Sequence, residues 1–277
     1  MCKLLLKNSY WLNLFILACT IISCKDKNDL LQKVWLYNED QTKKQVIENL
    51  TKYGGIKDQR LTAANFIDLQ ADGTYSSYLN SFENGKWYFK EQNLILVNRK
   101  KELVELVVNK VDDKELVCTD KMKRAVYRFN GLPNDFTATA QNPFSVENNQ
   151  WRIKAKHKES DSELRARLKN HFSFWEKYFA WGLTGKIDYL DIRSTPSLLK
   201  MYGNGFQLEY YENLFPEWKN SFYDTADCRI AYEHLYYKMY EKNIKWPDTK
   251  NRFERFVAAF HQLQGWMDET PSPYVKH

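Results

Sequence analysis

The stretch "FIDLQADGTYSSYLNSFENGKWYFK" (residues 66–90) decides the fold of the first half of the chain. Short runs of aromatic and β-branched residues alternate in it with turn residues, namely Asp72 with Gly73 and Asn84 with Gly85. Asp-Gly and Asn-Gly favour tight hairpin turns, because both residues can adopt the positive φ angles that such turns need. The stretch therefore predicts consecutive antiparallel strands.

The same pattern extends on both sides of this stretch and predicts eight short strands. They span residues 34–37, 66–70, 74–79, 86–90, 94–98, 103–109, 115–119 and 125–130. Strands joined by hairpins run antiparallel, and closing them into a barrel removes the exposed edges. We therefore expect an up-and-down β-barrel domain over residues 24–131, with a short helix over residues 41–53 that closes one mouth.

Four parts of this half resemble the lipocalin-like domains of exported bacterial lipoproteins: Trp35 on the first strand, "FIDLQADGTY" (66–75), "NGKWYF" (84–89) and "LILV" (94–97). The resemblance implies a barrel cup that holds a small apolar ligand, and its candidate binding residues are Trp35, Tyr75, Trp87 and Phe89. Lys33 stands where lipocalins usually have a glycine, two residues before the tryptophan. The alternative is a barrel filled by its own side chains.

The N-terminus has the layout of a secretory signal peptide over residues 1–23. Lys3 and Lys7 precede an apolar segment that is shorter than the roughly 20 residues of a membrane span. The tetrapeptide "IISC" (21–24) resembles the lipobox of bacterial lipoproteins, and Cys19 is a second candidate. The resemblance implies cleavage before Cys24 and a diacylglycerol on its sulfur, with acyl chains such as palmitate. It would anchor the protein in the cell envelope, most simply at the outer membrane.

The composition excludes some partners. The net charge of the 277-residue chain is +6, and removal of Lys3 and Lys7 with the signal leaves +4, without a run of five like charges. A nucleic-acid partner is therefore not expected. Cys118 and Cys228 are either buried thiols or an interdomain disulfide. No cysteine or histidine spacing suggests a metal site, and no cofactor is expected.

The second half has a helical period. Residues 132–150 are polar, contain Pro133 and Pro143, and are expected to form a linker. Beyond it we expect an aromatic-rich helical domain over residues 151–277, and hence an α+β protein. The expected helices span residues 161–181, 196–202, 225–242 and 248–267. The first has an apolar stripe, and Ser160 with Glu163 has the pattern of a capping box. The stripe consists of Leu164, Leu168, Phe172, Trp175 and Phe179.

Aromatic residues are dense between positions 171 and 240 and allow two interpretations. A small helical core can use them, because aromatic side chains bury the most area each. Exposed rings can instead stack on the C–H faces of sugars. Adjacent aromatic residues cannot all face inward, so Tyr210, Tyr211 and Trp218 are the candidates for glycan stacking.

No nucleophile–base pair can be identified from the sequence, and no catalytic residue is assigned. Asp188 and Asp191 are the best carboxylate pair for a hydrolase. The leading hypothesis is a membrane-anchored lipoprotein that is a binding or interaction module, not an enzyme. Its partner would be a small apolar ligand or an envelope protein. The alternatives are an accessory glycan-binding lipoprotein and a hydrolase with its site near Asp188 and Asp191.

Overall fold

The computed structural model describes residues 26–38, 65–79, 81–123, 125–132, 142–184, 198–202, 205–245 and 247–275. The signal peptide with Cys24, the expected helix over residues 41–53, and Asp188 with Asp191 lie outside these ranges.

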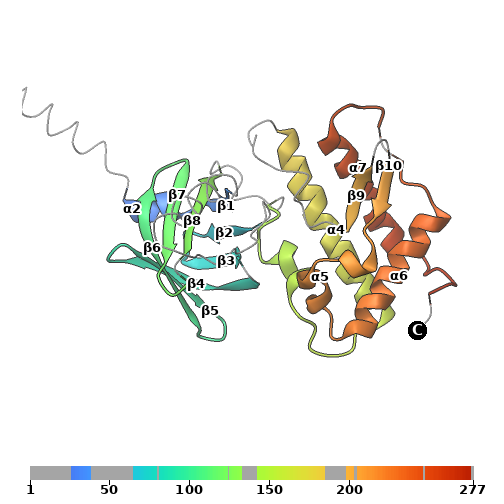
Figure 1. Cartoon of the computed structure of the whole chain (residues 1–277), viewed down its shortest axis with the longest axis horizontal. Coiled ribbons are helices and arrows are strands. Elements are labelled where there is room, and N and C mark those ends of the chain that lie inside the picture. The colour runs from blue at the N-terminus through green and yellow to red at the C-terminus, as the bar shows by residue number, and fades with distance from the viewer. Residues whose placement is uncertain are drawn as a thin grey trace, which may run out of the picture.

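Eight antiparallel strands form a closed barrel in the first half (Figure 1). Each strand pairs with its neighbours in sequence, and β1 closes the barrel by pairing with β8. The bounds are β1 (Val34–Tyr37), β2 (Phe66–Leu69), β3 (Thr74–Tyr78), β4 (Phe82–Lys90), β5 (Asn93–Asn98), β6 (Leu103–Val111), β7 (Glu115–Asp120) and β8 (Ala125–Gly131). The predicted up-and-down barrel is confirmed, and its shape is lipocalin-like.

One predicted turn is wrong. Asn84 and Gly85 lie within β4, and the hairpin between β3 and β4 turns earlier, after the pair Tyr78 and Phe82. Gly85 is needed for a different reason: a Cβ at this position would lie 2.9 Å from the Asn98 Cα on β5. The glycine therefore permits a close approach of two strands. The turn at Asp72 is confirmed, and the Asp72 side chain accepts a hydrogen bond from the Thr74 backbone N–H at 2.8 Å.

A short helix, α2 (Lys27–Leu31), leads into β1. Leu31 is fully buried in the apolar cluster of the barrel interior, and its carbonyl accepts a hydrogen bond from Trp35 Nε1 at 2.9 Å. Alternate residues of β8, such as Tyr127 and Phe129, belong to the same cluster. The expected alternation between inward and outward side chains is therefore present.

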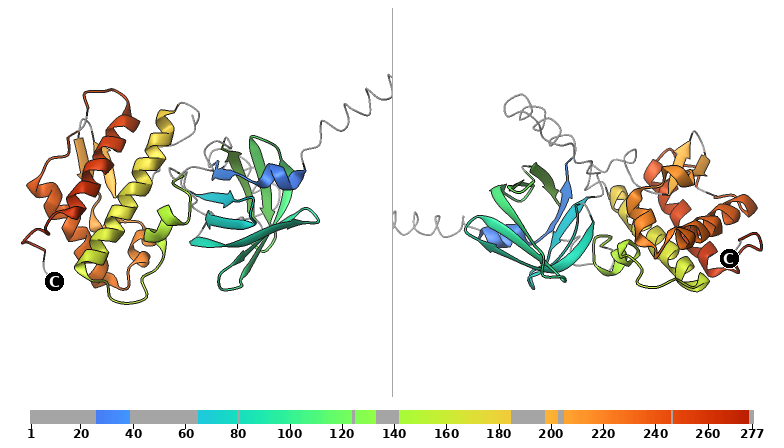
Figure 2. Two further views of the ribbon diagram at one scale, coloured as in Figure 1. Left: turned by 180° about the vertical axis from the view of Figure 1, so that it is seen from behind. Right: turned by 60° about the horizontal axis from the view of Figure 1, so that its bottom comes forward.

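The second half is mainly helical, which confirms the α+β class. Its elements are η2 (Glu147–Arg152), α4 (Asp161–Leu183), β9 (Leu199–Tyr202), β10 (Gly205–Leu208), η3 (Tyr211–Asn213), α5 (Pro216–Ser221), α6 (Thr225–Glu241) and α7 (Arg252–Asp268). Helices α4 and α7 lie side by side (Figures 1 and 2). The stacked ring pair Phe179 and Phe256, with centroids 4.5 Å apart, joins these two helices.

The predicted start of α4 is confirmed, because Ser160 and Glu163 form a complete capping box. The five residues of its predicted stripe are all buried. The helix expected over residues 196–202 is wrong: Leu199–Tyr202 is a strand that pairs with Gly205–Leu208. A short apolar run does not distinguish a strand from a buried helical turn, and here the pairing partner decides.

The two halves share one apolar core. Strands β1 and β2 are buried along their whole length, because their outer faces contact the second half. Leu36 and Phe66 belong to the same cluster as Phe144 and the apolar face of α4. Residues 142–150 of the expected linker contribute to this junction. Phe144 is fully buried, and its ring centroid lies 4.6 Å from that of Phe66. The division into separate domains stays a prediction.

Candidate functional site

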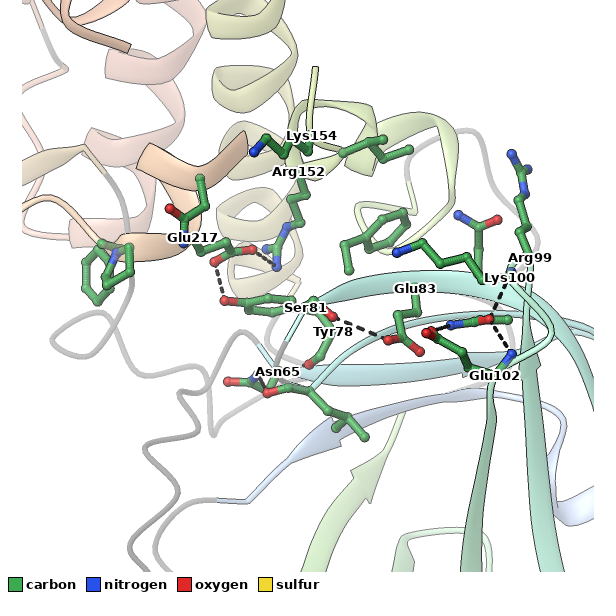
Figure 3. A pocket seen from close by; sticks show the side chains of 18 of the residues that line it. Asn65, Tyr78, Ser81, Glu83, Arg99, Lys100, Glu102, Arg152, Lys154 and Glu217 are labelled. Carbon is green, nitrogen blue, oxygen red and sulfur yellow. Dashed lines mark hydrogen bonds and ion pairs between the residues drawn. The ribbon is translucent and has the colours of Figure 1, made fainter. Parts of the chain in front are cut away.

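A groove of about 1200 Å³ lies where the barrel meets the helical half (Figure 3). We call it the junction groove. From the barrel it is lined mainly by Tyr78, Phe82, Glu83, Arg99, Lys100 and Glu102. From the helical half it is lined mainly by Arg152, Lys154, Lys156, Asn213, Glu217 and Asn220. Segments from both halves are therefore needed to form it.

A buried ionic contact ties the two walls together at the floor of the groove. Arg152 Nη1 donates to Glu217 Oε1 at 3.0 Å, and the Tyr78 hydroxyl donates to Glu217 Oε2 (Figure 3). The Arg152 side chain is fully buried, and its guanidinium carbon lies 4.1 Å from the Tyr78 ring centroid. Its Nε and Nη2 have no hydrogen-bond partner in the described ranges, so aromatic faces take the place of polar partners.

Burial sets the ionisation of this contact. It raises the pKa of the Glu217 carboxyl, while the Arg152 guanidinium and the hydrogen bonds to Glu217 oppose the rise. Burial, together with the Glu217 charge, also raises the pKa of the Tyr78 phenol. Tyr78 therefore stays neutral and acts as a hydrogen-bond donor.

Two pairs of basic residues rim the groove from opposite halves. Arg99 and Lys100 lie in the turn between β5 and β6, while Lys154 and Lys156 follow η2. All four are exposed, and none has an ion-pair partner within the described part of the chain. Glu83 and Glu102 are the acidic residues of the barrel wall.

Local structure fixes both pairs. The Asn98 side chain accepts hydrogen bonds from the backbone N–H groups of Lys100 and Glu102, each at 2.9 Å, and so holds the β5–β6 turn. On the other wall, Ala155 donates its backbone N–H to the Ser221 carbonyl at 2.9 Å. Since Ala155 lies between Lys154 and Lys156, this bond holds the segment that carries both lysines against α5.

The groove chemistry suits an anion. Lysine and arginine form charge-assisted hydrogen bonds with carboxylate, sulfate and phosphate oxygens. The amides of Asn84 and Asn220 also line the groove, and no hydrogen bond of either side chain is found among the described residues. Its charged residues, its amides and the Phe82 ring can together contact a ligand that has both oxygens and an apolar face.

The four candidate residues of the barrel do come together. Trp35, Tyr75 and Trp87 are buried in the interior cluster, and Phe89 packs against it. The Trp87 indole donates to the Gln70 carbonyl at 2.9 Å, whereas the Tyr75 hydroxyl has no partner in the described ranges. These large side chains therefore occupy part of the barrel interior.

The three candidates for glycan stacking are placed differently from one another. Tyr210 is 73% exposed, while Tyr211 is half-buried and lies edge-on to Tyr232 at 5.4 Å. Trp218 is buried in the helical core, where its ring meets Phe222 at 4.6 Å. Trp218 therefore has no open face for a sugar.

The described residues also contain titratable and thiol groups outside the groove. No group of three or more His, Cys, Asp and Glu side chains there could hold a metal ion. Cys118 and Cys228 are buried free thiols, and burial raises the pKa of both. None of the helices in the described ranges combines the length and apolar character needed to span a bilayer.

Sequence reasoning missed the residues of the junction groove. Arg152 and Glu217 resemble ordinary surface charges in the sequence, and their separation hides the contact. The alternation of Lys154, Lys156 and Lys158 was the one available signal, and by itself it indicates only an extended segment with one exposed face.

The fold defines an α+β protein with a lipocalin-like closed barrel and a helical second half. Comparisons of the chain with models of protein families, with curated proteins and with solved structures gave no significant match.

Proposed function

We propose that the protein is a membrane-anchored binding protein of the bacterial cell envelope, and that its junction groove binds an anionic ligand. One observation carries the second part: four exposed cations from two walls face one groove without ion-pair partners in the described ranges. An anion between the walls would neutralise charge on both. The interaction would weaken with salt, because exposed charges are screened.

The groove is a better candidate than the barrel interior. Trp35, Tyr75 and Trp87 are buried in the apolar cluster of the interior, so an apolar ligand there would share the space with three large side chains. A small apolar ligand in the barrel, or an envelope-protein partner, stays a prediction. Native mass spectrometry of the chain without its signal, purified in mild buffer, checks the first of these. A co-purified lipid or apolar metabolite would favour the barrel over the groove.

The test of the groove is a pair of charge-reversal variants. Lys154→Glu with Lys156→Glu changes the groove, and Lys114→Glu with Lys121→Glu makes the same charge change at exposed barrel positions outside it. The probes are polygalacturonate, dextran sulfate and inorganic polyphosphate, with neutral dextran as the control.

The groove variant should bind at least one of the three polyanions about tenfold more weakly than the wild type, a change of about 1.4 kcal/mol. The barrel variant should stay within about twofold. Equal losses in both variants would mean non-specific charge attraction and would refute a groove site. Absence of binding to all three polyanions would refute it as well.

The membrane anchor has its own test. Cys24→Ala removes the sulfur that the lipobox resemblance identifies as the acylation site. The variant should leave the membrane fraction and lose radiolabelled palmitate, because no acyl chain then holds the protein to the bilayer. Unchanged membrane association together with unchanged lipid labelling would exclude Cys24 as the anchor.

A further inference from the structure

Tyrosines form a continuous row along the outside of α6. We define the tyrosine row as Tyr240 together with a chain of five rings, namely Tyr211, Tyr232, Tyr236, Tyr237 and Tyr274. Successive ring centroids among these five are 5.4, 6.3, 5.4 and 5.6 Å apart. Tyr236 is 49% exposed, and Tyr240, one helical turn further along, is 80% exposed. The positions 232, 236 and 240 are four residues apart, so their rings share one face of the helix.

The row begins where the junction groove ends. Tyr211 is the first residue of η3, and Asn213, the last residue of the same turn, lines the groove. Lys219 Nζ lies 5.1 Å from the Tyr211 ring centroid, and its neighbour Asn220 also lines the groove. Lys219 and Asn220 belong to α5, which lies between the barrel and α6 in Figure 1. The row and the groove therefore meet at η3 and α5.

The chemistry of this surface selects its ligand. The row offers phenol rings with polar hydroxyls, and apart from Leu183 the exposed large hydrophobic residues of the described helical half are all tyrosines. Tyrosine is also common in protein interfaces, so the cations of the adjoining groove, and not the rings alone, favour an anionic sugar polymer as the ligand. A sugar ring has an apolar C–H face edged by hydroxyls, which matches a tyrosine in both respects.

We propose that the groove and the tyrosine row together bind a linear acidic polysaccharide. The acidic sugars would lie between the cations of the groove, and the chain would continue over Tyr236 and Tyr240. Residues four positions apart are separated by about 6 Å along the helix axis. This distance is close to the length of one pyranose unit in an extended chain. This inference rests on the proposed function, because the groove supplies the charged part of the site.

The experiment compares long polymers with short oligomers that the groove alone can hold. The probes are polygalacturonate, alginate and hyaluronate, each as a polymer and as a short oligomer. The row variant is Tyr236→Ala with Tyr240→Ala, and Tyr236→Phe with Tyr240→Phe keeps both rings. The matched control is Tyr88→Ala with Tyr223→Ala, which removes two rings that are each 46% exposed and lie outside the row.

The row variant should bind the recognised polymer about tenfold more weakly, with its oligomer affinity unchanged within about twofold. The phenylalanine variant should keep most of the polymer affinity, and the control should behave like the wild type. The groove variant with Lys154→Glu and Lys156→Glu should lose both polymer and oligomer binding.

Other outcomes separate the two proposals. If the row variant binds the polymer normally while the groove variant loses it, the row is not part of the site, although the groove function stands. If no acidic polysaccharide binds while inorganic polyphosphate does, the glycan inference falls and the anion site remains. If the groove variant binds every probe normally, both proposals fail. Equal loss of polymer and oligomer in the row variant would also overturn the extended site.

Discussion

Arg152 Nη1 and Glu217 Oε1 lie 3.0 Å apart in an ion pair that closes the floor of the junction groove, with the Arg152 side chain fully buried and the Glu217 side chain 15% exposed. The pair also reaches the barrel, because the Tyr78 hydroxyl donates to the same carboxylate. A charge buried in this way is tolerated only while it is paired, since its transfer from water costs several kcal/mol. The stability of the junction therefore depends on these three side chains together.

Replacing Glu217 with alanine should lower the free energy of unfolding by about 3–5 kcal/mol, because the Arg152 charge then stays buried without a counter-charge. Replacing both residues with leucine should cost less than the sum of the losses in the single variants Arg152→Leu and Glu217→Leu, since no charge is left unpaired. Urea denaturation of the two single variants and the double variant measures this coupling. Glu212→Ala, at an exposed position nearby, is the control and should change stability by less than about 0.5 kcal/mol. A loss below about 1 kcal/mol in Glu217→Ala would contradict the buried pair.

Asp68 predicts a dependence of stability on pH. Burial raises the pKa of Asp68 to about 7 from 3.8, against the lowering effect of hydrogen bonds from Gln70 at 2.5 Å and Asn142 at 3.3 Å. Between these two pH values the native state holds a proton that the unfolded chain has lost. This contribution to stability is therefore lost as pH rises from 3.8 to about 7 and is constant above that.

Asp68→Asn should remove this dependence and keep the shape of the side chain. The change in the free energy of unfolding from about pH 4.5 to about pH 8 should be more positive in the variant than in the wild type, by about 2–4 kcal/mol. Asp72→Asn is a control of opposite sign, because hydrogen bonds from Thr74 lower the pKa of Asp72. An Asp68→Asn variant with the pH profile of the wild type would show that this carboxyl is ionised at low cost.

Much of the barrel could be predicted because its signals are local. An Asp-Gly turn and alternating apolar residues act over a few positions, so the strands could be placed from them. Asn84 and Gly85 have the same local chemistry, but the neighbouring strand β5 uses the glycine for close approach instead. Tertiary contact thus overrode a turn signal that is sound in isolation.

The candidate site could not be predicted, because the contacts that form it are not local in the sequence. Tyr78 and Glu217 are 139 residues apart, and the groove exists only because the barrel packs on the helical half. No sequence period relates such positions. The aromatic density did predict the helical core correctly at Trp175 and Phe179, but it could not tell that Trp218 lies inside while Tyr240 lies outside.

His171 predicts a loss of stability in acid. Burial, and then the nearby charge of Arg152, hold the pKa of His171 well below 6.5. The unfolded chain therefore gains a proton below pH 6.5 that the native state does not bind, and stability falls as pH decreases. The ring lies edge-on to Trp151 at a centroid distance of 4.4 Å, so phenylalanine is the replacement that best keeps the packing.

In His171→Phe the free energy of unfolding should depend less steeply on pH in acid. Below the ordinary histidine pKa its slope should be smaller by about 1.4 kcal/mol per pH unit. The measurement belongs in an Asp68→Asn background, because Asp68 acts in the opposite direction over the same pH range. His157→Phe, at an exposed site, should leave the slope unchanged. An acid limb in His171→Phe as steep as in its parent would assign the loss of stability to another group.

Two glycines give opposite predictions for the same substitution. At Gly85 an added Cβ would lie 2.9 Å from the Asn98 Cα, a contact with backbone that cannot rotate away. Gly85→Ala should therefore push β4 from β5 and lower the free energy of unfolding by about 1–3 kcal/mol. At Gly265, inside α7, an added Cβ would meet nothing within 4 Å. Gly265→Ala should raise stability by about 0.5–1 kcal/mol, because alanine loses less backbone entropy in a helix.

Urea denaturation of the two single variants, at one pH, compares these effects in the same background. The double variant should show the sum of the two changes, because the glycines lie in different halves and share no neighbours among the contacts found around each Cβ position. A neutral Gly85→Ala would mean that the strands separate at little cost. The glycine would then be explained neither by a turn nor by close approach, and the register of β4 with β5 would have to be reconsidered.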